Sequence, residues 1–402
     1  MAGFFTKKET ESKTRPDGKT YSCYSCGLYK NAKSAKMQPV GEFKKEILIL
    51  GSNPTRVDDE ENTLWLDNSG RFLRKTLTKF NIDIYKDCLS LNAVNCYPAN
   101  HKVTNFEIDS CRFVMVQKII MDYQPKVVIL LGEQALYSFL GQRTSFNVGE
   151  MDKWRGWIIP DRDFKTFVCP MYSPEEVVSN KSIELTTIWE NDLQQALKQV
   201  SKPWPSFKKP NIHIIEDLSI LDTIQSGVVA FDYETTGLKP QAFGHRIICA
   251  SVAVDENTAY TFLFKNRKQS APFYRLLKNP QVSKMAHNMK FEDTWTTNRL
   301  KFDVVNWGFD SMQAAHILDN RPGVCGLKFQ TYVNFGVVDY SSEITPYLRS
   351  AKGGNEINTI HKLLETPDKT KQLLMYCALD SIYEYRLAMK QIDIMNYDFL
   401  PF

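Results

Sequence analysis

Short apolar runs rich in β-branched residues alternate along this chain with segments whose apolar residues recur at helical spacing. The clearest run is Val127-Val-Ile-Leu-Leu-Gly132, which follows a predicted helix over residues 111–123. Continuous apolar strands between helices are typical of parallel sheets that are covered on both faces. The pattern therefore predicts an α/β layer fold. We predict strands at 47–51, 88–94, 127–132, 211–215, 228–232, 247–254 and 259–264.

A proline-rich segment divides the chain. Residues 202–210 hold three prolines in nine residues, and a new run of strands follows them. A chain of 402 residues is long enough for two domains of ordinary size. We predict a loose basic tail over 1–20, a first domain over 21–200, a linker over 201–210 and a second domain over 211–402.

Composition indicates an ordinary globular protein. Hydrophobic residues make up 43% and charged residues 24%, which excludes a disordered or fibrous chain. No apolar run is long enough to span a membrane, and the amino terminus lacks a signal core, so we expect a soluble cytoplasmic protein. Residues 1–45 hold ten Lys/Arg against four Asp/Glu. Such a segment can neutralise phosphates, although a solvated tail has the same composition.

Two carboxylates end an apolar strand in the second half. Residues 228–234 read Val-Val-Ala-Phe-Asp-Tyr-Glu, and the alternation of a strand places Asp232 and Glu234 on one face. Because neighbouring carboxylates repel, a divalent cation is their natural partner. A solvated strand end is the alternative for this segment taken alone.

Two further segments carry acidic residues. Residues 287–293 read His-Asn-Met-Lys-Phe-Glu-Asp, and residues 376–380 read Tyr-Cys-Ala-Leu-Asp. Thr366-Pro367 is typical of a helix N-terminus, which predicts a helix through the second of these segments. Tyr376 and Asp380 then share one face of that helix.

Together the three segments resemble the motifs of DEDD-type 3′–5′ exonucleases, and residues 211–402 are similar to the proofreading domain of family A DNA polymerases. The tyrosine subclass is indicated because Met375 stands where the histidine subclass has His. The resemblance implies a ribonuclease H-like fold with two Mg²⁺ or Mn²⁺ ions, one generating the attacking hydroxide and one stabilising the leaving oxygen. It implies metal ligands at Asp232, Glu234, Asp380 and an acid of the second motif, a water-orienting Tyr376, and nucleic-acid contacts by Asn288 and Lys290.

The second motif departs from the family pattern. The family usually has Asp four residues after Asn288, whereas this chain has Glu292 there and Asp293 next. We prefer Glu292 as the ligand because it keeps the family spacing, and Asp293 is the alternative.

The first half carries a cysteine pattern. Nine cysteines in a cytoplasmic chain indicate metal ligands or buried thiols rather than disulfides. Cys23 and Cys26 form a C-x-x-C unit, which alone is compatible with zinc, iron–sulfur or neither, and a second C-x-x-C is missing. Cys96 lies in Asn-Ala-Val-Asn-Cys-Tyr-Pro, and Cys111 follows fifteen residues later. The cysteines predicted to be core residues are Cys88, Cys169, Cys249, Cys325 and Cys377.

This arrangement closely resembles the four-iron, four-sulfur uracil-DNA glycosylases. The resemblance implies a glycosylase-like parallel-sheet α/β domain with a 4Fe–4S cluster held by Cys23, Cys26, Cys96 and Cys111. It also implies a pocket for a flipped base. In that pocket Trp65 would stack on the base, Asn92 would contact its edge and Asn53 would position water, with Tyr172 close by.

Two catalytic features of the glycosylase family are missing. Ser52 stands where the family has an acid, and Tyr172 replaces the histidine of its His-Pro-Ser motif. Water activation and stabilisation of a departing uracil anion both depend on such groups. We therefore expect a DNA-binding or vestigial glycosylase domain, and an active glycosylase fused to an exonuclease is the alternative.

The order of the two domains resembles the front portion of DNA polymerases from some large bacteriophages. Too few residues follow Asp380 for a polymerase palm, so we expect a stand-alone exonuclease or one whose polymerase is a separate polypeptide. The expected activity is metal-dependent removal of nucleotides from single-stranded 3′ ends of DNA during proofreading or replication. A non-catalytic accessory subunit and an RNA-processing nuclease are the alternatives.

Overall fold

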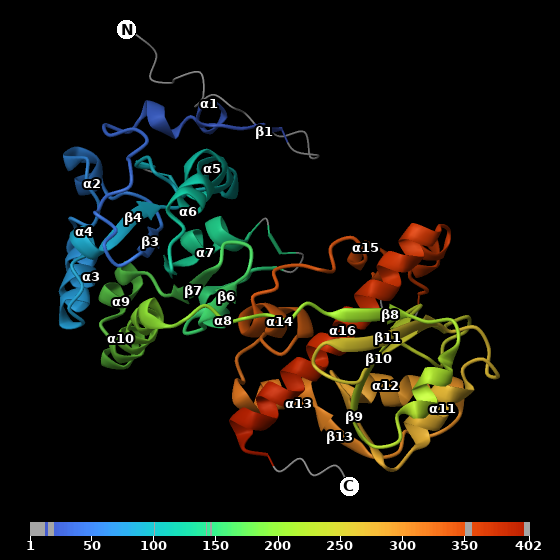
Figure 1. Ribbon diagram of the computed structural model, residues 1–402. Coiled ribbons are helices and arrows are strands. Elements are labelled where there is room, and N and C mark those ends of the chain that lie inside the picture. The colour runs from blue at the N-terminus through green and yellow to red at the C-terminus, as the bar shows by residue number, and fades with distance from the viewer. Residues whose placement is uncertain are drawn as a thin grey trace. The chain divides into compact units, whose positions relative to one another are not determined.

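The structure, a computed structural model, describes residues 13–14, 20–99, 101–141, 143–144, 147–349 and 356–397. The chain forms two compact units (Figure 1). The first comprises Met1–Pro205 and Tyr332–Val338, and the second comprises Ser206–Thr331 and Asp339–Phe402. Residues 332–338 thus belong to the first unit, although they fall within the second domain expected from sequence.

The amino-terminal segment contains one small sheet. Strand β1 (Lys13–Thr14) pairs antiparallel with β2 (Thr20–Tyr21), although β1 falls in the tail that we expected to be loose. The other residues of 1–19 lie outside the described part of the chain.

The first unit is built on a five-stranded sheet with the order β4-β3-β5-β7-β6. Its strands are β3 (Ile47–Gly51), β4 (Cys88–Asn92), β5 (Val127–Leu131), β6 (Ile159–Asp161) and β7 (Thr166–Met171). All but the edge strand β6 run parallel, and every residue in them is buried, as expected for a sheet with both faces covered. The helices are α1 (Cys23–Cys26), α2 (Arg56–Glu61), α3 (Asn68–Lys79), α4 (Ile84–Asp87), α5 (Asn105–Cys111), α6 (Gln117–Tyr123), α7 (Glu133–Leu140), α8 (Met151–Trp154), α9 (Pro174–Asn180) and α10 (Ile183–Lys198).

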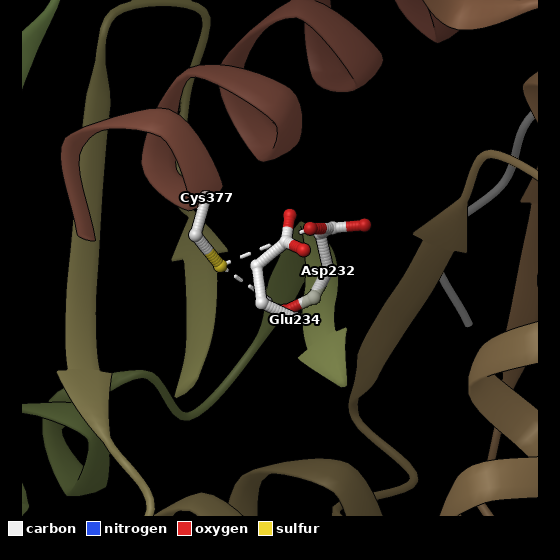
Figure 2. Close-up of side chains that lie close together, drawn as sticks. All are labelled: Asp232, Glu234 and Cys377. Atoms are coloured by element: carbon white, nitrogen blue, oxygen red, sulfur yellow. Dashed lines mark hydrogen bonds between the residues drawn. The ribbon is translucent and has the colours of Figure 1, made fainter. Parts of the chain in front are cut away.

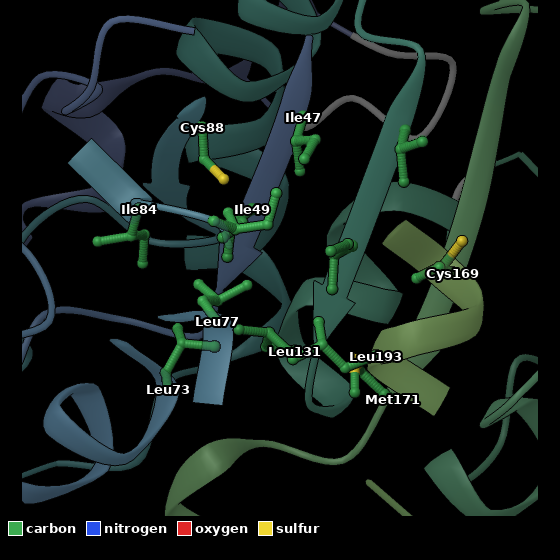
Figure 3. Packing of buried hydrophobic residues seen from close by; sticks show 14 of the residues in the cluster. Ile47, Ile49, Leu73, Leu77, Ile84, Cys88, Leu131, Cys169, Met171 and Leu193 are labelled. Carbon is green, nitrogen blue, oxygen red and sulfur yellow. The ribbon is translucent and has the colours of Figure 1, made fainter. Parts of the chain in front are cut away.

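One apolar core of this unit lies between the sheet and helices α3 and α10 (Figure 3). Alternate residues of β3 and β5 face it, because successive side chains of a strand point to opposite sides. Its members include Ile47, Ile49, Leu73, Leu77, Leu131 and Leu193. The packing holds the carboxyl ends of β3 and β4 side by side.

The second unit has a six-stranded mixed sheet with the order β13-β12-β9-β10-β11-β8. Its strands are β8 (Asn211–Ile214), β9 (Gly227–Thr235), β10 (Ile247–Ala253), β11 (Thr258–Leu263), β12 (Val282–Ala286) and β13 (Trp307–Asp310). Strand β10 runs antiparallel to both β9 and β11, whereas β12 runs parallel to both β9 and β13. The run 282–286 was not among the strands predicted from sequence, and its centre is a buried lysine, Lys284.

Helix α16 (Pro367–Met395) packs across β9, β10 and β11. It begins as predicted, with the Thr366 side chain accepting from the Lys369 N–H and proline in the first turn. The Ser251 hydroxyl of β10 donates to the carbonyl of Cys377 at 2.7 Å and fixes the helix on the sheet. The other helices are α11 (Ala271–Lys278), α12 (Met289–Trp295), α13 (Ser311–Leu318), α14 (Leu327–Phe335) and α15 (Thr345–Leu348). In the described part of the chain, no helix is both long and apolar enough to cross a bilayer.

Candidate functional sites

Strand β9 and helix α16 bring carboxylates together. Asp232 and Glu234 lie on the same face of β9, and Figure 2 shows them beside Cys377 of α16. One ligand atom from each of the three residues lies within 4.8 Å of the others. Asp232 is partly exposed and Glu234 is buried.

Tyr376 and Asp380 lie one turn apart on α16, and both are buried. Oδ1 of Asp380 accepts hydrogen bonds from the Lys328 ammonium of α14 and from the Tyr340 hydroxyl, the latter at 2.6 Å. We did not predict either partner. Lys328 lies in a stretch that resembles the exonuclease family, but nothing in its local pattern marks it as a site residue.

The two acids of the second motif have different surroundings. Glu292 lies in the first turn of α12 and is buried, and its Oε2 has no hydrogen-bond partner among the described residues. Oδ1 of Asp293 instead accepts from the indole Nε1 of Trp307 at 3.0 Å. Burial and then the charge of Asp232 raise the pKa of Glu292, which favours Glu292 over Asp293 as the acid near the first motif.

The other two predicted residues of this motif lie at the start of α12. Asn288 has a left-handed backbone with φ of 75°, and its N–H donates to Oδ1 of Asp310 at 3.1 Å. Lys290 is exposed. Both residues remain predictions as nucleic-acid contacts.

The carboxylates destabilise one another's charged forms. Burial, followed by the charge of Asp380, raises the pKa of Asp232, and burial followed by the charge of Asp232 raises the pKa of Glu234. A fifth acid, Glu384, lies one turn beyond Asp380 and was not predicted. Burial and then the charge of Glu292 raise the pKa of Glu384, and its Oε1 has no partner among the described residues. Buried carboxylates with unpartnered oxygens are costly alone, and this oxygen donor set fits Mg²⁺ or Mn²⁺.

Cys377 is buried as predicted, but it also contacts the carboxylates. Its Sγ lies 3.8 Å from Oδ2 of Asp232. Burial raises the pKa of the Cys377 thiol, so the group stays protonated and acts as a weak donor to Asp232. Cys325 departs from the prediction of a core residue because it is only partly buried.

The four predicted cluster ligands come from three segments of the first unit. Cys23 and Cys26 are the first and last residues of α1, Cys96 follows β4, and Cys111 is the last residue of α5. The four cysteines are near enough for their thiolate charges to interact. Burial is the largest cause of the raised pKa of Cys111, and the charges of Cys23, Cys26 and Cys96 each raise that pKa further. All nine cysteines, each within the described residues, are free thiols.

Backbone N–H groups are directed at three of these four sulfurs. The N–H of Lys36 donates to Sγ of Cys96 at 3.2 Å, and those of Leu28 and Asn95 donate to Cys26 and Cys111. Burial nevertheless raises the pKa of Cys26 to about 11. One buried and three partly buried thiols, with N–H donors to three of the sulfurs, fit an iron–sulfur cluster, because bound metal offsets the cost of the thiolates and such hydrogen bonds are typical of its surroundings.

A small pocket lies at the carboxyl ends of β3 and β4. Asn53, Trp65 and Asn92 line it, so the structure brings together three of the four residues predicted for the base pocket. The exception is Tyr172, which is not among the lining residues. Its hydroxyl donates to Oδ1 of Asp152 at 2.5 Å, and the next residue, Ser173, lines the pocket instead.

Of the three acids that line the pocket, Glu175 is exposed and the other two serve as helix caps. Asp58 accepts from the N–H groups of Thr55 and Leu66, and Asp67 accepts from the N–H of Gly70. Neither acid was predicted from sequence. Because their oxygens already accept backbone hydrogen bonds, these carboxylates are poorly placed to activate water.

Comparison with known families separates the two halves. Residues 38–197 match the uracil DNA glycosylase superfamily, and residues 213–390 match the 3′-5′ exonuclease family of DNA polymerase A type. The second half is a 3′–5′ exonuclease domain. The first half is a uracil-DNA glycosylase-like domain, so the predicted fold class is confirmed: two α/β domains, one glycosylase-like and one ribonuclease H-like. Both matches are to families that process nucleic acid.

Individual relatives cover one half each. The type-4 uracil-DNA glycosylase of Saccharolobus solfataricus is 26% identical over 184 residues, which are 44% of this chain and 82% of that protein. The enzyme of the same name from Thermotoga maritima is 27% identical over 183 residues, 45% of this chain and 90% of that protein. Among solved structures, Brucella melitensis NrnC has a TM-score of 0.33 at 20% identity, covering 48% of this chain and 85% of its own. Escherichia coli RNase D has a TM-score of 0.33 at 15% identity, covering 47% of each chain.

Proposed function

We propose that this protein is a metal-dependent 3′–5′ exodeoxyribonuclease of the tyrosine subclass. The observation that carries the proposal is the convergence of buried and partly buried acids from β9, α12 and α16. Asp232, Glu234, Glu292 and Asp380 would hold two Mg²⁺ or Mn²⁺ ions. When bound, such ions supply an activated water and stabilise the leaving 3′ oxygen.

The residues around the carboxylates suit a single-stranded 3′ end. Burial and then the charge of Asp380 raise the pKa of Tyr376, so its phenol keeps its proton and can orient a water by a hydrogen bond. A groove beside it is lined by Tyr340, Tyr376, Gln372 and Lys371. Aromatic rings provide stacking surfaces for unpaired bases, and a lysine can contact phosphate.

DNA is the proposed substrate because the first domain resembles uracil-DNA glycosylases. Trp65 and Asn92 would engage an unstacked base, and Cys23, Cys26, Cys96 and Cys111 would hold a 4Fe–4S cluster that ties α1 to α5. We propose a role for this domain in holding DNA or docking a DNA polymerase. The process would then be proofreading or another step of replication.

The decisive experiment follows a 5′-labelled single-stranded DNA incubated with protein and Mg²⁺. The expected product is a ladder shortened from the 3′ end. Asp232→Ala should abolish it because a central ligand is lost, whereas the matched variant Asp303→Ala, which changes an exposed acid of the same unit, should not. Full activity in Asp232→Ala or in EDTA would refute the proposal, and inactive wild-type protein would favour an accessory subunit.

A further inference from the structure

An ammonium group lies inside the carboxylate cluster. Lys328, in the first turn of α14, donates to Oδ1 of Asp380, and its Nζ lies 3.1 Å from Oη of Tyr340. The same Nζ lies 4.2 Å from the ring centres of both Tyr340 and Tyr376. The Lys328 side chain is 26% exposed and that of Asp380 is 8% exposed, so solvent screens their attraction only in part.

The charge of Lys328 acts beyond Asp380. It lowers the pKa of both Asp232 and Glu234, against the larger opposing effect of burial. Among the described residues, the ion pairs formed by Asp232, Glu234, Glu292 and Asp380 include no other lysine or arginine. Lys328 is therefore the main internal compensation for the negative charge of this cluster.

We propose that Lys328 is a built-in counter-ion that occupies Asp380 until a divalent cation displaces it. A metal ion and an ammonium that lie against one carboxylate oxygen repel each other, so the two cations compete for Asp380. Lys328 thus sets how tightly the site binds metal. The displaced ammonium stays beside Tyr340 and Tyr376, two residues that line the groove. This inference rests on the proposed exonuclease function and adds a residue to its metal site.

A purely structural role for Lys328 predicts a different result. If the lysine only fastens α14 to α16, removing it would leave metal affinity unchanged or weaken it through disorder of Asp380. The counter-ion role predicts the opposite sign, since a competitor for Asp380 is lost. The sign of the change in metal affinity therefore separates the two explanations without reference to nuclease activity.

The test is titration of the metal-free protein with Mn²⁺ alone, followed by calorimetry or by the electron paramagnetic resonance signal of free Mn²⁺. Lys328→Met should bind Mn²⁺ at least about tenfold more tightly than wild type, the equivalent of one charge-assisted hydrogen bond. Lys328→Arg keeps the charge and should show wild-type or weaker affinity. The control Lys265→Met removes a lysine from an exposed pair with Glu216 and should change nothing.

Comparison of wild type with Asp232→Ala tests the proposed function, and comparison with Lys328→Met tests the counter-ion role. Asp232→Ala identifies Mn²⁺ binding that belongs to the carboxylates, so absence of Asp232-dependent binding in wild type would refute the proposed function itself. Asp232-dependent binding with unchanged or weaker affinity in Lys328→Met would refute the counter-ion role alone. Thermal melting in EDTA checks that each variant folds. If Lys328→Met lowers the melting temperature, Lys328→Gln is used in its place and should also bind Mn²⁺ more tightly than wild type.

Discussion

The indole Nε1 of Trp307 lies 3.0 Å from Oδ1 of Asp293. This hydrogen bond joins α12 to β13 and uses the acid that directly follows Glu292. The two neighbouring acids thus have separate tasks, because the Asp293 carboxylate has a protein donor whereas an oxygen of Glu292 has none among the described residues.

Substitution of Glu292 should lower the exonuclease rate, whereas substitution of Asp293 should mainly lower stability. Glu292→Gln should lower the exonuclease rate by on the order of 10²-fold or more, because a metal ligand loses its charge. Asp293→Asn should keep most activity and lose about 1 kcal/mol of unfolding free energy through a weakened hydrogen bond. Digestion of labelled single-stranded DNA and thermal melting measure both effects. Equal loss of activity in the two variants would contradict the assignment of Glu292.

Tyr376→Phe should separate chemistry from metal binding. The ring remains in place, but the phenol that orients water is lost, so we expect the turnover rate to fall by about 10²-fold. Mn²⁺ affinity should stay at the wild-type value because the carboxylates are unchanged. Tyr385→Phe, a partly exposed position on the same helix, is the matched control. A lower Mn²⁺ affinity in Tyr376→Phe would instead show that the phenol supports the ligands.

Stabilisation by metal should grow with pH. Burial and neighbouring charges raise the folded-state pKa of Asp232, Glu234 and Glu292 above their unfolded values. The folded metal-free protein therefore binds more protons than the unfolded chain, and it loses stability as pH rises from the ordinary carboxyl pKa of about 4 through the raised values. Because Mg²⁺ replaces those protons, its effect on the melting temperature should be small near pH 5 and large near pH 8. An equal effect at both pH values would argue against metal binding at these acids.

The first domain should be coloured and depend on its cluster for stability. Purified protein should absorb broadly in the visible range and contain iron. Cys96→Ser should remove the colour and lower the melting temperature of this domain, because the free energy of ligand binding also stabilises the fold. Cys88→Ser changes a buried thiol in β4 outside the four and should keep the colour. Stoichiometric zinc without iron would contradict the cluster.

The base pocket should bind DNA but excise uracil weakly. Binding should weaken as salt rises, since phosphate contacts dominate affinity. Trp65→Ala should weaken it further by removing a stacking surface. The acid and the histidine of the glycosylase family are absent, because Ser52 and Tyr172 stand in their places and the Tyr172 hydroxyl donates to Asp152, so the excision rate should fall by about 10²-fold or more for each missing group. Abasic-site formation at the rate of an ordinary uracil-DNA glycosylase, lost in Asn53→Ala, would favour an active glycosylase.

Local patterns in the sequence were sufficient for several of the elements and for part of the site. Alternation along β9 places Asp232 and Glu234 on one face, and capping at Thr366 starts the helix on which Tyr376 and Asp380 are stacked. These relationships span at most a few residues, and the geometry of a single strand or helix determines them.

Tertiary packing decided what lies around those residues. Lys328 meets Asp380 only because α14 and α16 come together, and Glu384 joins the cluster only because the fold brings it within range of the charge of Glu292 on α12. The division between Glu292 and Asp293 depends on Trp307, a residue of another strand. Such contacts join positions far apart in the chain, and no local periodicity encodes them. Their energies depend on burial and on the distances between charges, which exist only once the chain is folded.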